Sequence, residues 1–265
     1  MKTLLTIFTP TYNRAYLLPQ LYKSLLGQTN QSSVEWLIVD DGSVDDTEEL
    51  VKQWEKEGAI KINYIKTPNG GKQRAINEGV LQAKGELFFI VDSDDFLTTD
   101  AVEKIHTIWQ YCKGQQFGGL LLRKILNGEV LGKPFPYYEF KANSLEVAYK
   151  YGVKQDKAEI FVTEKLKEFP FPVAKDEKFV PEAYIWNRLT KKYPLWCVDE
   201  AIYCCEYLPD GYSHNLKKNF KENPKGFAMY YKDVLRYKEV PVKEKAKALI
   251  RYFQMQYYRL CKRKN

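Results

Sequence analysis

Short apolar runs alternate with amphipathic stretches in the first half of the chain. The runs are rich in Leu, Ile, Val and Phe, as is typical of buried β-strands, and lie at 3–9, 34–41, 61–67 and 86–92. Each run is followed by a segment whose apolar residues have the spacing of a helix. These segments are 14–26, one that ends near Glu57, 72–83 and 101–112. This alternation predicts an α/β domain with a mostly parallel sheet and helices on both faces.

The second half of the chain is less regular. Its pattern predicts a hairpin at Asn127-Gly128, a helix over 144–151, a proline-rich loop over 169–181, a helix over 181–193 and a strand region over 195–208. Two basic, aromatic helices over about 224–238 and 241–263 follow. We therefore expect an α/β domain over residues 1–210 and a helical extension over 211–265.

Composition limits the classes of protein that fit this pattern. The chain has 265 residues, 45% of them hydrophobic, and it holds no apolar run of about 18 residues that could cross a membrane. Its first residues lack the long apolar stretch of a signal peptide, and its five Cys and two His show no zinc-binding spacing. We expect a cytoplasmic protein.

Charge is divided unevenly along the chain. Residues 211–265 hold 15 Lys and Arg against 4 Asp and Glu, a net charge of +11, whereas residues 1–210 have a net charge of −4 (26 against 30). Within 243–265, Leu249, Ile250, Phe253 and Leu260 fall near one helical face. Such a helix either lies on an anionic membrane surface or packs its apolar face on the domain. No nucleic-acid module is recognisable, so nucleic acid is not an expected partner.

Acidic residues follow two of the predicted strands. Asp92 and Asp94 come after the run FFIV, and residues two apart in an extended segment point to the same side. Carboxylates placed in this way suit a divalent cation with open positions for phosphate oxygens, although they could also cap the next helix. Asp40 and Asp41 end the second predicted strand, where a carboxylate can accept hydrogen bonds from a nucleoside. Because ligands bind at the carboxyl ends of parallel strands, these positions predict a nucleotide site.

A glycine pair precedes the third predicted helix. Gly70 and Gly71 lead into Lys72 and Arg74. Backbone N–H groups at a helix start and two nearby cations suit a diphosphate, although a solvated helix start gives the same pattern. The spacing is not that of a P-loop.

The motifs TPTYNR, VDDGSVDDT, GGKQRAINEGVLQAKGELFFIVDSDD and PEAYIWNRL together resemble the inverting family-2 glycosyltransferases of the GT-A fold. The resemblance covers residues 3–105 closely and 175–215 more loosely. It implies a nucleotide-sugar-binding half over 1–105, an acceptor half over 106–210, and transfer of a hexosyl or N-acetylhexosaminyl group. The expected donor is a UDP-sugar, and the expected acceptor is a saccharide or lipid-linked saccharide of a cell-surface polysaccharide or glycolipid.

The resemblance also implies roles for individual residues. Thr9, Pro10, Thr11, Tyr12 and Asp41 would hold the base, with Tyr12 packing on its face, and Asp92 would contact the ribose. Asp94 would bind Mg²⁺ or Mn²⁺ that bridges the diphosphate. The remaining residues of the expected nucleotide-sugar site are Arg14, Asp40, Lys72, Arg74 and Ser93.

An inverting transferase needs a base for the acceptor hydroxyl. The resemblance places this base at the start of the helix in PEAYIWNRL, which favours Glu182. Asp176 and Glu177 are the alternatives, and an acid in the first turn of a helix is also favoured by the helix dipole.

Three further residues are candidates from their positions in the motifs. Tyr184 and Trp186 lie beside the expected base and are acceptor-site candidates, and His214 in DGYSHN is a candidate to assist the metal.

Two other functions share parts of this pattern. One is a nucleotidyltransferase that makes nucleotide sugars, which would carry a Gly-rich basic loop where this chain has TPTYNR. The other is a non-catalytic sugar-nucleotide-binding scaffold, which would not need acids at 92, 94 and 182. If the tail binds lipid, the protein is expected on the inner face of the cell membrane.

Overall fold

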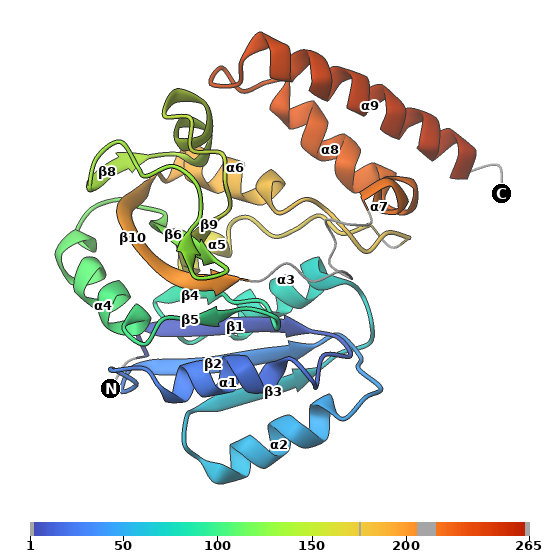
Figure 1. The fold of residues 1–265 in the computed structure, drawn as a ribbon. Coiled ribbons are helices and arrows are strands. Elements are labelled where there is room, and N and C mark those ends of the chain that lie inside the picture. The colour runs from blue at the N-terminus through green and yellow to red at the C-terminus, as the bar shows by residue number, and fades with distance from the viewer. Residues whose placement is uncertain (1–2, 175, 206–215, 263–265) are drawn as a thin grey trace.

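The protein folds into a sheet with helices on both sides and a helical layer at one end, as the computed structural model in Figure 1 shows. The structure describes residues 3–174, 176–205 and 216–262. Within these ranges the strands form a single ten-stranded sheet.

The first half of the chain forms the parallel part of the sheet. Its strands are β1 (Leu5–Thr11), β2 (Val34–Asp40), β3 (Ile62–Lys66) and β4 (Leu87–Ile90), which lie in the order β3-β2-β1-β4. The helices after them are α1 (Leu18–Leu26), α2 (Thr47–Glu57), α3 (Lys72–Gln82) and α4 (Ala101–Cys112). All eight elements were predicted. Helix α1, however, begins four residues later than expected, because Pro19 is tolerated only in the first turn of a helix.

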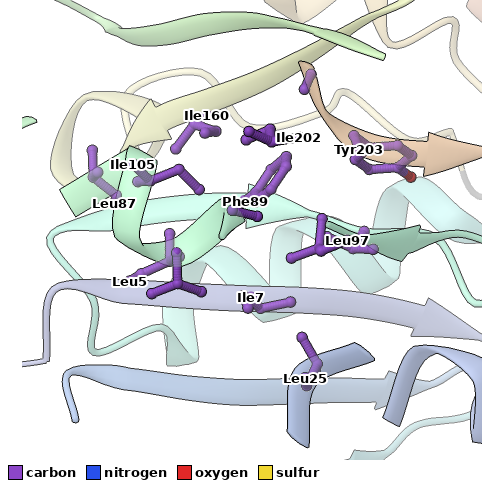
Figure 2. Close-up of a cluster of buried hydrophobic side chains, with 14 of the residues drawn as sticks. Leu5, Ile7, Leu25, Leu87, Phe89, Leu97, Ile105, Ile160, Ile202 and Tyr203 are labelled. Carbon is purple, nitrogen blue, oxygen red and sulfur yellow. The ribbon is translucent and has the colours of Figure 1, made fainter. Parts of the chain in front are cut away.

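Alternate residues of the strands enter two separate cores. On one face, Leu5 and Ile7 of β1 and Phe89 of β4 pack in one cluster with residues of α1, α2 and α4. Figure 2 shows part of this cluster, including Leu25 of α1 and Ile105 of α4. On the other face, Phe8 and Phe88 pack against α3. The sheet is therefore buried on both sides, and its exposed features lie at the strand ends.

The second half of the chain extends the same sheet. Beyond β4 the order continues β9-β6-β10-β5, with β7 paired to β6 and β8 to β10. These strands are β5 (Phe96–Leu97), β6 (Gly119–Leu126), β7 (Glu129–Val130), β8 (Glu139–Ala142), β9 (Lys157–Val162) and β10 (Leu195–Cys205). Strand β9 is antiparallel to β4 and β6, whereas β10 runs parallel to β6.

Several local predictions for this half are confirmed. The β6–β7 hairpin turns at Asn127 and Gly128, whose φ angles are 51° and 84°. The short helix η1 (Glu146–Lys150) is preceded by a reciprocal cap, in which Asn143 and Glu146 each donate a backbone N–H to the other's side chain at 2.9 Å. Helix α6 (Ala183–Lys192) follows the proline-rich loop as expected.

Other elements of this half were not predicted. They are β5, β8, β9, the one-turn helix α5 (Thr163–Leu166) and helix α7 (Leu216–Glu222). Strand β9 was missed because Lys157 and Glu159 interrupt its apolar run.

The chain ends in two long helices, α8 (Pro224–Val234) and α9 (Val242–Lys262). Helix α8 ends four residues before the predicted boundary at 238. It contacts α6, where Arg188 of α6 pairs with Asp233 at 2.5 Å, and α9 packs along α8 on the side away from the sheet (Figure 1). None of the described helices is long and apolar enough to cross a membrane. The division between a catalytic domain over 1–210 and an extension over 211–265 stays a prediction.

Candidate active site

The carboxyl ends of β1, β2 and β4 meet at one edge of the sheet. Thr11 lies opposite Asp40, and the N–H of Val91 donates to the carbonyl of Phe8 at 2.9 Å. The topology therefore gathers the segments after these strands, as the parallel pattern predicts.

The end of β1 supplies one exposed ring. Thr9 and Thr11 are buried, and the hydroxyl of Thr9 accepts a hydrogen bond from the indole N–H of Trp36 at 2.9 Å. The hydroxyl of Thr11 has no hydrogen-bond partner among the described residues. Pro10 is also buried, whereas Tyr12 leaves 47% of its surface exposed. Of the five residues expected to hold a base, four are buried, and Tyr12 alone has a side chain open to a ligand.

The two acids after β2 have different surroundings. Asp40 is fully buried and accepts hydrogen bonds from the N–H of Ser43 at 2.7 Å and the hydroxyl of Tyr64 at 2.5 Å. Asp41 accepts from the N–H groups of Gly70 at 2.6 Å and Gly71 at 2.7 Å. Asp40 thus stabilises its turn, and Asp41 holds the loop before α3 against the end of β2.

This pairing corrects the expected use of the glycine pair. The sequence suited the backbone N–H groups at this helix start to a diphosphate, with a solvated helix start as the alternative. In this structure the N–H groups of Gly70 and Gly71 donate to the Asp41 carboxylate. Gly71 has a φ of 95°, and a Cβ at this position would lie 2.2 Å from the carbonyl oxygen of Lys178. The glycine is therefore required for close contact of two loops.

The two cations at the start of α3 also differ. Arg74 donates to the carbonyl oxygens of Gly70 at 2.9 Å and Ala174 at 2.8 Å, so its guanidinium ties two loops together. Lys72 points to the strand ends, and its ammonium lies 2.7 Å from Asp92 and 2.9 Å from Glu182. One cation therefore joins the expected ribose-binding acid to the expected base, which are 90 residues apart in the chain.

The electrostatics of Asp92 and Lys72 favour the charged form of each. Burial by itself raises the pKa of Asp92, but the ammonium of Lys72 outweighs burial and holds the pKa of Asp92 below its ordinary value. Burial likewise opposes the charge on Lys72, yet Asp92 and Glu182 raise the pKa of Lys72 above its ordinary value. Lys72 therefore links the two acids in one ion network.

Three residues follow Asp92 in the turn after β4. Ser93 is buried. Burial and the Asp92 carboxylate raise the pKa of Asp94, and the same two causes raise the pKa of Asp95 to about 7. Asp95 accepts a hydrogen bond from the hydroxyl of Tyr203 at 2.5 Å, and that hydroxyl accepts from the N–H of Asp92 at 3.1 Å. Tyr203 of β10 therefore fixes the backbone of the acidic turn.

A cavity of about 50 Å³ lies beside Glu182, and it brings together residues that the sequence analysis missed. Lys124, Lys157 and Glu159 line it together with Asp92 and Glu182. Burial raises the pKa of Glu159 to about 7 although Lys157 opposes this, and burial lowers the pKa of Lys157. The signal that could have found Lys157 and Glu159 is their spacing, because charges two apart within an apolar strand share one face.

The two alternative bases lie outside this cavity. Asp176 is exposed and pairs with Lys225 at 2.6 Å. Glu177 is buried, and its carboxylate accepts from the N–H groups of Lys225 at 2.9 Å and Gly226 at 3.0 Å. These N–H groups lie in the first turn of α8, so Glu177 caps that helix.

This capping role predicts a loss of stability in Glu177→Ala. Two N–H groups at a helix start would lose their acceptor, which costs about 1–3 kcal/mol of unfolding free energy. Urea unfolding measures the change. Asp176→Ala, which removes an exposed ion pair next in the sequence, is the matched control and should cost less unfolding free energy than Glu177→Ala. Equal stability of the two variants would contradict the role of Glu177.

The remaining candidates are placed as follows. Tyr184 is buried in the core, where Arg188 lies 4.2 Å from its ring centre. Trp186 is also buried and packs on Phe161, with ring centres 4.5 Å apart, while lining the small cavity. Arg14 donates to the hydroxyl of Tyr16 at 2.9 Å. The prediction for His214 lies outside the described residues.

The side chains at this site supply only part of the ligands that a hard divalent cation needs. No group of three Asp, Glu, His or Cys within the described ranges could hold a metal ion by itself. The carboxylate of Asp92 forms an ion pair with Lys72. Asp94 is therefore the nearby carboxylate that could bind a cation. An ion at this position would need oxygens from a bound diphosphate or from water, as Mg²⁺ sites at phosphates commonly do.

Comparison with known proteins establishes the class of fold and a match to one family over the first part of the chain. The chain superposes on the UDP complex of Staphylococcus aureus TarS residues 1–349 with a TM-score of 0.67 at 20% identity, covering 95% of this chain and 71% of that one. It superposes on the mannosyltransferase PcManGT of Pyrobaculum calidifontis, solved with GDP-Man and Mn²⁺, with a TM-score of 0.62 at 18% identity, covering 96% and 70%. At this identity the likeness establishes the fold alone, which is the predicted GT-A fold. Residues 6–111 match the model of glycosyl transferase family 2, so the predicted family resemblance is confirmed.

Similar sequences agree with this family. The poly(ribitol-phosphate) β-N-acetylglucosaminyltransferase TarS of Staphylococcus aureus is 26% identical over 196 residues, which are 68% of this chain and 32% of that protein. The GalNAc(5)-diNAcBac-PP-undecaprenol β-1,3-glucosyltransferase of Campylobacter jejuni is 29% identical over 198 residues, covering 71% and 60%. The chain therefore spans about a third of the first relative and three fifths of the second.

Proposed function

We propose that the protein is an inverting, metal-dependent glycosyltransferase. It would move a hexosyl or N-acetylhexosaminyl group from a UDP-sugar to an acceptor hydroxyl, in the synthesis of a cell-surface polysaccharide or glycolipid. The observation that carries this proposal is the ion network of Asp92, Lys72 and Glu182 at the carboxyl edge of a GT-A sheet. It places a candidate base next to the strand ends where a nucleotide-sugar would bind.

The donor would lie across the ends of β1, β2 and β4. The exposed ring of Tyr12 would pack on the base, beside the loop that Asp41 fixes. Asp92 would accept from a ribose hydroxyl. UDP is the proposed nucleotide because structural relatives were solved with UDP and with UDP-GlcNAc.

Glu182 would act as the general base. Its carboxylate would take the proton of the acceptor hydroxyl while that oxygen attacks the anomeric carbon from the face opposite the UDP leaving group. The bond to the diphosphate oxygen breaks in the same step, so the configuration inverts. Glu182 lies at the start of α6, which holds it rigidly over the cavity beside Asp92.

Lys72 would change partners when the donor binds. In this structure its ammonium shares its charge between Asp92 and Glu182. Diphosphate oxygens would compete for that ammonium, and its withdrawal from Glu182 would free that carboxylate to accept a hydrogen bond from the acceptor hydroxyl. The donor would thereby prepare the base before the acceptor reacts.

Asp94 would hold Mg²⁺ or Mn²⁺ on the diphosphate. When bound, this ion supplies neutralisation of the charge that develops on the leaving group. The acceptor would be a saccharide or a lipid-linked saccharide. Two relatives support this choice, since their names specify a poly(ribitol phosphate) and an undecaprenol-linked glycan.

The proposal predicts that UDP with Mn²⁺ stabilises the protein. At a hundredfold excess over Kd, binding adds about 2.7 kcal/mol, which raises Tm by roughly 5–10 °C for a chain of this size. Thermal unfolding with UDP, GDP and CDP, each with Mn²⁺, measures the shift, and release of UDP from UDP-sugars measures turnover.

A ring variant makes the test specific for the site. Tyr12→Ala should reduce the shift caused by UDP and leave the unliganded Tm unchanged. Tyr111→Ala is the control, because Tyr111 is 55% exposed at the far end of α4. If no nucleotide shifts Tm and no UDP-sugar is turned over with Mn²⁺, the proposed function is wrong.

A further inference from the structure

Helix α9 carries an apolar stripe that faces solvent. Ile250, Phe253, Tyr257 and Leu260 expose 59–69% of their surface, and Leu249 beside them exposes 43%. Their spacing of three and four residues places them on one side of the helix. A row of five exposed large apolar side chains is uncommon on a protein that has no partner there.

Packing on the rest of the chain does not explain this stripe. Ala248 and Met255 are buried against α7, α8 and the loop around Tyr237 to Val240, and they lie on the opposite side of α9. The alternative in which the apolar face packs on the domain therefore does not hold for the described part of the chain. The helix packs through a second, narrower face and leaves the larger apolar face uncovered.

Positive charge lies along the stripe. Helix α9 holds six Lys and Arg against one Glu. Lys243, Lys247 and Arg251 are exposed and follow one border of the stripe. An apolar stripe with a basic border is the pattern of helices that lie in the surface of an anionic bilayer.

We propose that α9 docks the protein on an anionic lipid membrane, with the helix axis in the plane of the surface. Ile250, Phe253, Tyr257 and Leu260 would enter the boundary between headgroups and acyl chains, and the basic border would contact lipid phosphates. A second copy of this chain fits less well, because pairing two stripes would bring their basic borders together with no acidic partner. Anionic lipid removes that repulsion.

The docked helix would lie close to the candidate active site. The ammonium of Lys262 donates to the carbonyl oxygens of Asp176 at 3.1 Å and Glu222 at 2.8 Å, so the end of α9 contacts the loop that also touches α3 through Arg74. A lipid-linked acceptor would then have its saccharide near Glu182. This last step rests on the proposed function, whereas the docking itself does not.

Vesicle binding of the full chain tests the proposal. We expect co-sedimentation with vesicles of phosphatidylcholine and phosphatidylglycerol, at least tenfold weaker binding to phosphatidylcholine alone, and loss of binding in 1 M salt. The stripe variant Ile250→Ser/Phe253→Ser/Leu260→Ser should bind the anionic vesicles at least about tenfold more weakly, with an unchanged circular dichroism spectrum. The matched control is Leu81→Ser/Val130→Ser, which removes exposed apolar side chains elsewhere and should bind as the unaltered protein does.

A charge variant tests the basic border of α9 separately from its apolar stripe. Lys243→Gln/Lys247→Gln should weaken binding to anionic vesicles and leave binding to neutral vesicles unchanged. The proposal is overturned if the unaltered protein does not sediment with anionic vesicles, or if the stripe variant binds equally well. It is also overturned if sedimentation equilibrium without lipid shows that the unaltered protein is a dimer and that the stripe variant is a monomer. UDP-induced thermal shifts of the same samples report on the proposed function separately.

Discussion

Glu182→Gln should lower turnover by about 10²–10⁴-fold while UDP binding stays nearly unchanged. The amide has almost the shape of the carboxylate but cannot take a proton from an acceptor hydroxyl. Folding should survive, because Lys72 keeps its contact with Asp92 at 2.7 Å. Release of UDP from a UDP-sugar with acceptor present gives kcat, and calorimetry with UDP and Mn²⁺ gives the donor affinity.

Control variants distinguish the loss of the base from the loss of any other acid that pairs with a lysine. Glu168→Gln breaks an exposed ion pair with Lys192 at 2.6 Å and should keep full turnover. Glu177→Gln should affect stability more than kcat, because that carboxylate caps α8. If Asp176→Asn or Glu177→Gln loses more turnover than Glu182→Gln, the assignment of the base is wrong.

The strand ends of the site could be predicted from the sequence because their signals are local. A run such as FFIV followed by acids indicates both a buried strand and a polar end, and four strand–helix units in succession indicate a parallel sheet. The parallel pairing of β1 with β2 and β4 then places Tyr12, Asp41 and Asp92 at one edge. No long-range information is needed for this step.

The partners of these residues could not be predicted, because they depend on contacts between distant segments. Asp41 and the glycine pair both look suited to a ligand in the sequence, but the structure pairs them with each other. Lys72 meets Glu182 across 110 residues of chain. A charged residue near a strand end therefore indicates a site without showing whether the ligand or another side chain takes its charge.

The two acids of the 176–182 segment show the same limit. Glu177 and Glu182 both precede a helix and have the same chemistry in the sequence. Glu177 is turned to the start of α8, a helix that begins 47 residues later, whereas Glu182 faces the cavity beside β9. Only the tertiary fold separates a cap from a candidate base.

Helix α9 shows how much can be predicted from an amphipathic sequence pattern. The spacing of Leu249, Ile250, Phe253 and Leu260 predicted an apolar face, and the helix has that face. Whether such a face points to the protein or to solvent depends on the second face of the helix, and Met255 supplies the contact that turns the stripe outward. Amphipathicity alone could not decide between packing and docking.

Asp94→Asn should abolish measurable turnover and remove the metal dependence of UDP binding. Lys72 pairs with Asp92, and Asp95 accepts a hydrogen bond from Tyr203, which leaves Asp94 as the carboxylate of the acidic turn for a cation. Burial beside Asp92 makes the negative charge of Asp94 costly without a cation. A divalent ion held between Asp94 and the diphosphate would offset both charges, which is worth several kcal/mol. For the unaltered protein, we expect UDP affinity to fall by roughly 10²-fold or more when EDTA replaces Mn²⁺.

The comparison of four affinities isolates this contribution. Calorimetry of UDP with Mn²⁺ and with EDTA, for the unaltered protein and for Asp94→Asn, forms a cycle in which the effect of the metal should vanish in the variant. Asp46→Asn is the control, since Asp46 is an exposed acid at the same edge of the sheet and should keep the full metal effect. If the unaltered protein binds UDP equally well in Mn²⁺ and in EDTA, Asp94 is not a metal ligand. In that case Lys72 would have to offset the diphosphate charge, and Lys72→Met should then weaken UDP binding more than Asp94→Asn does.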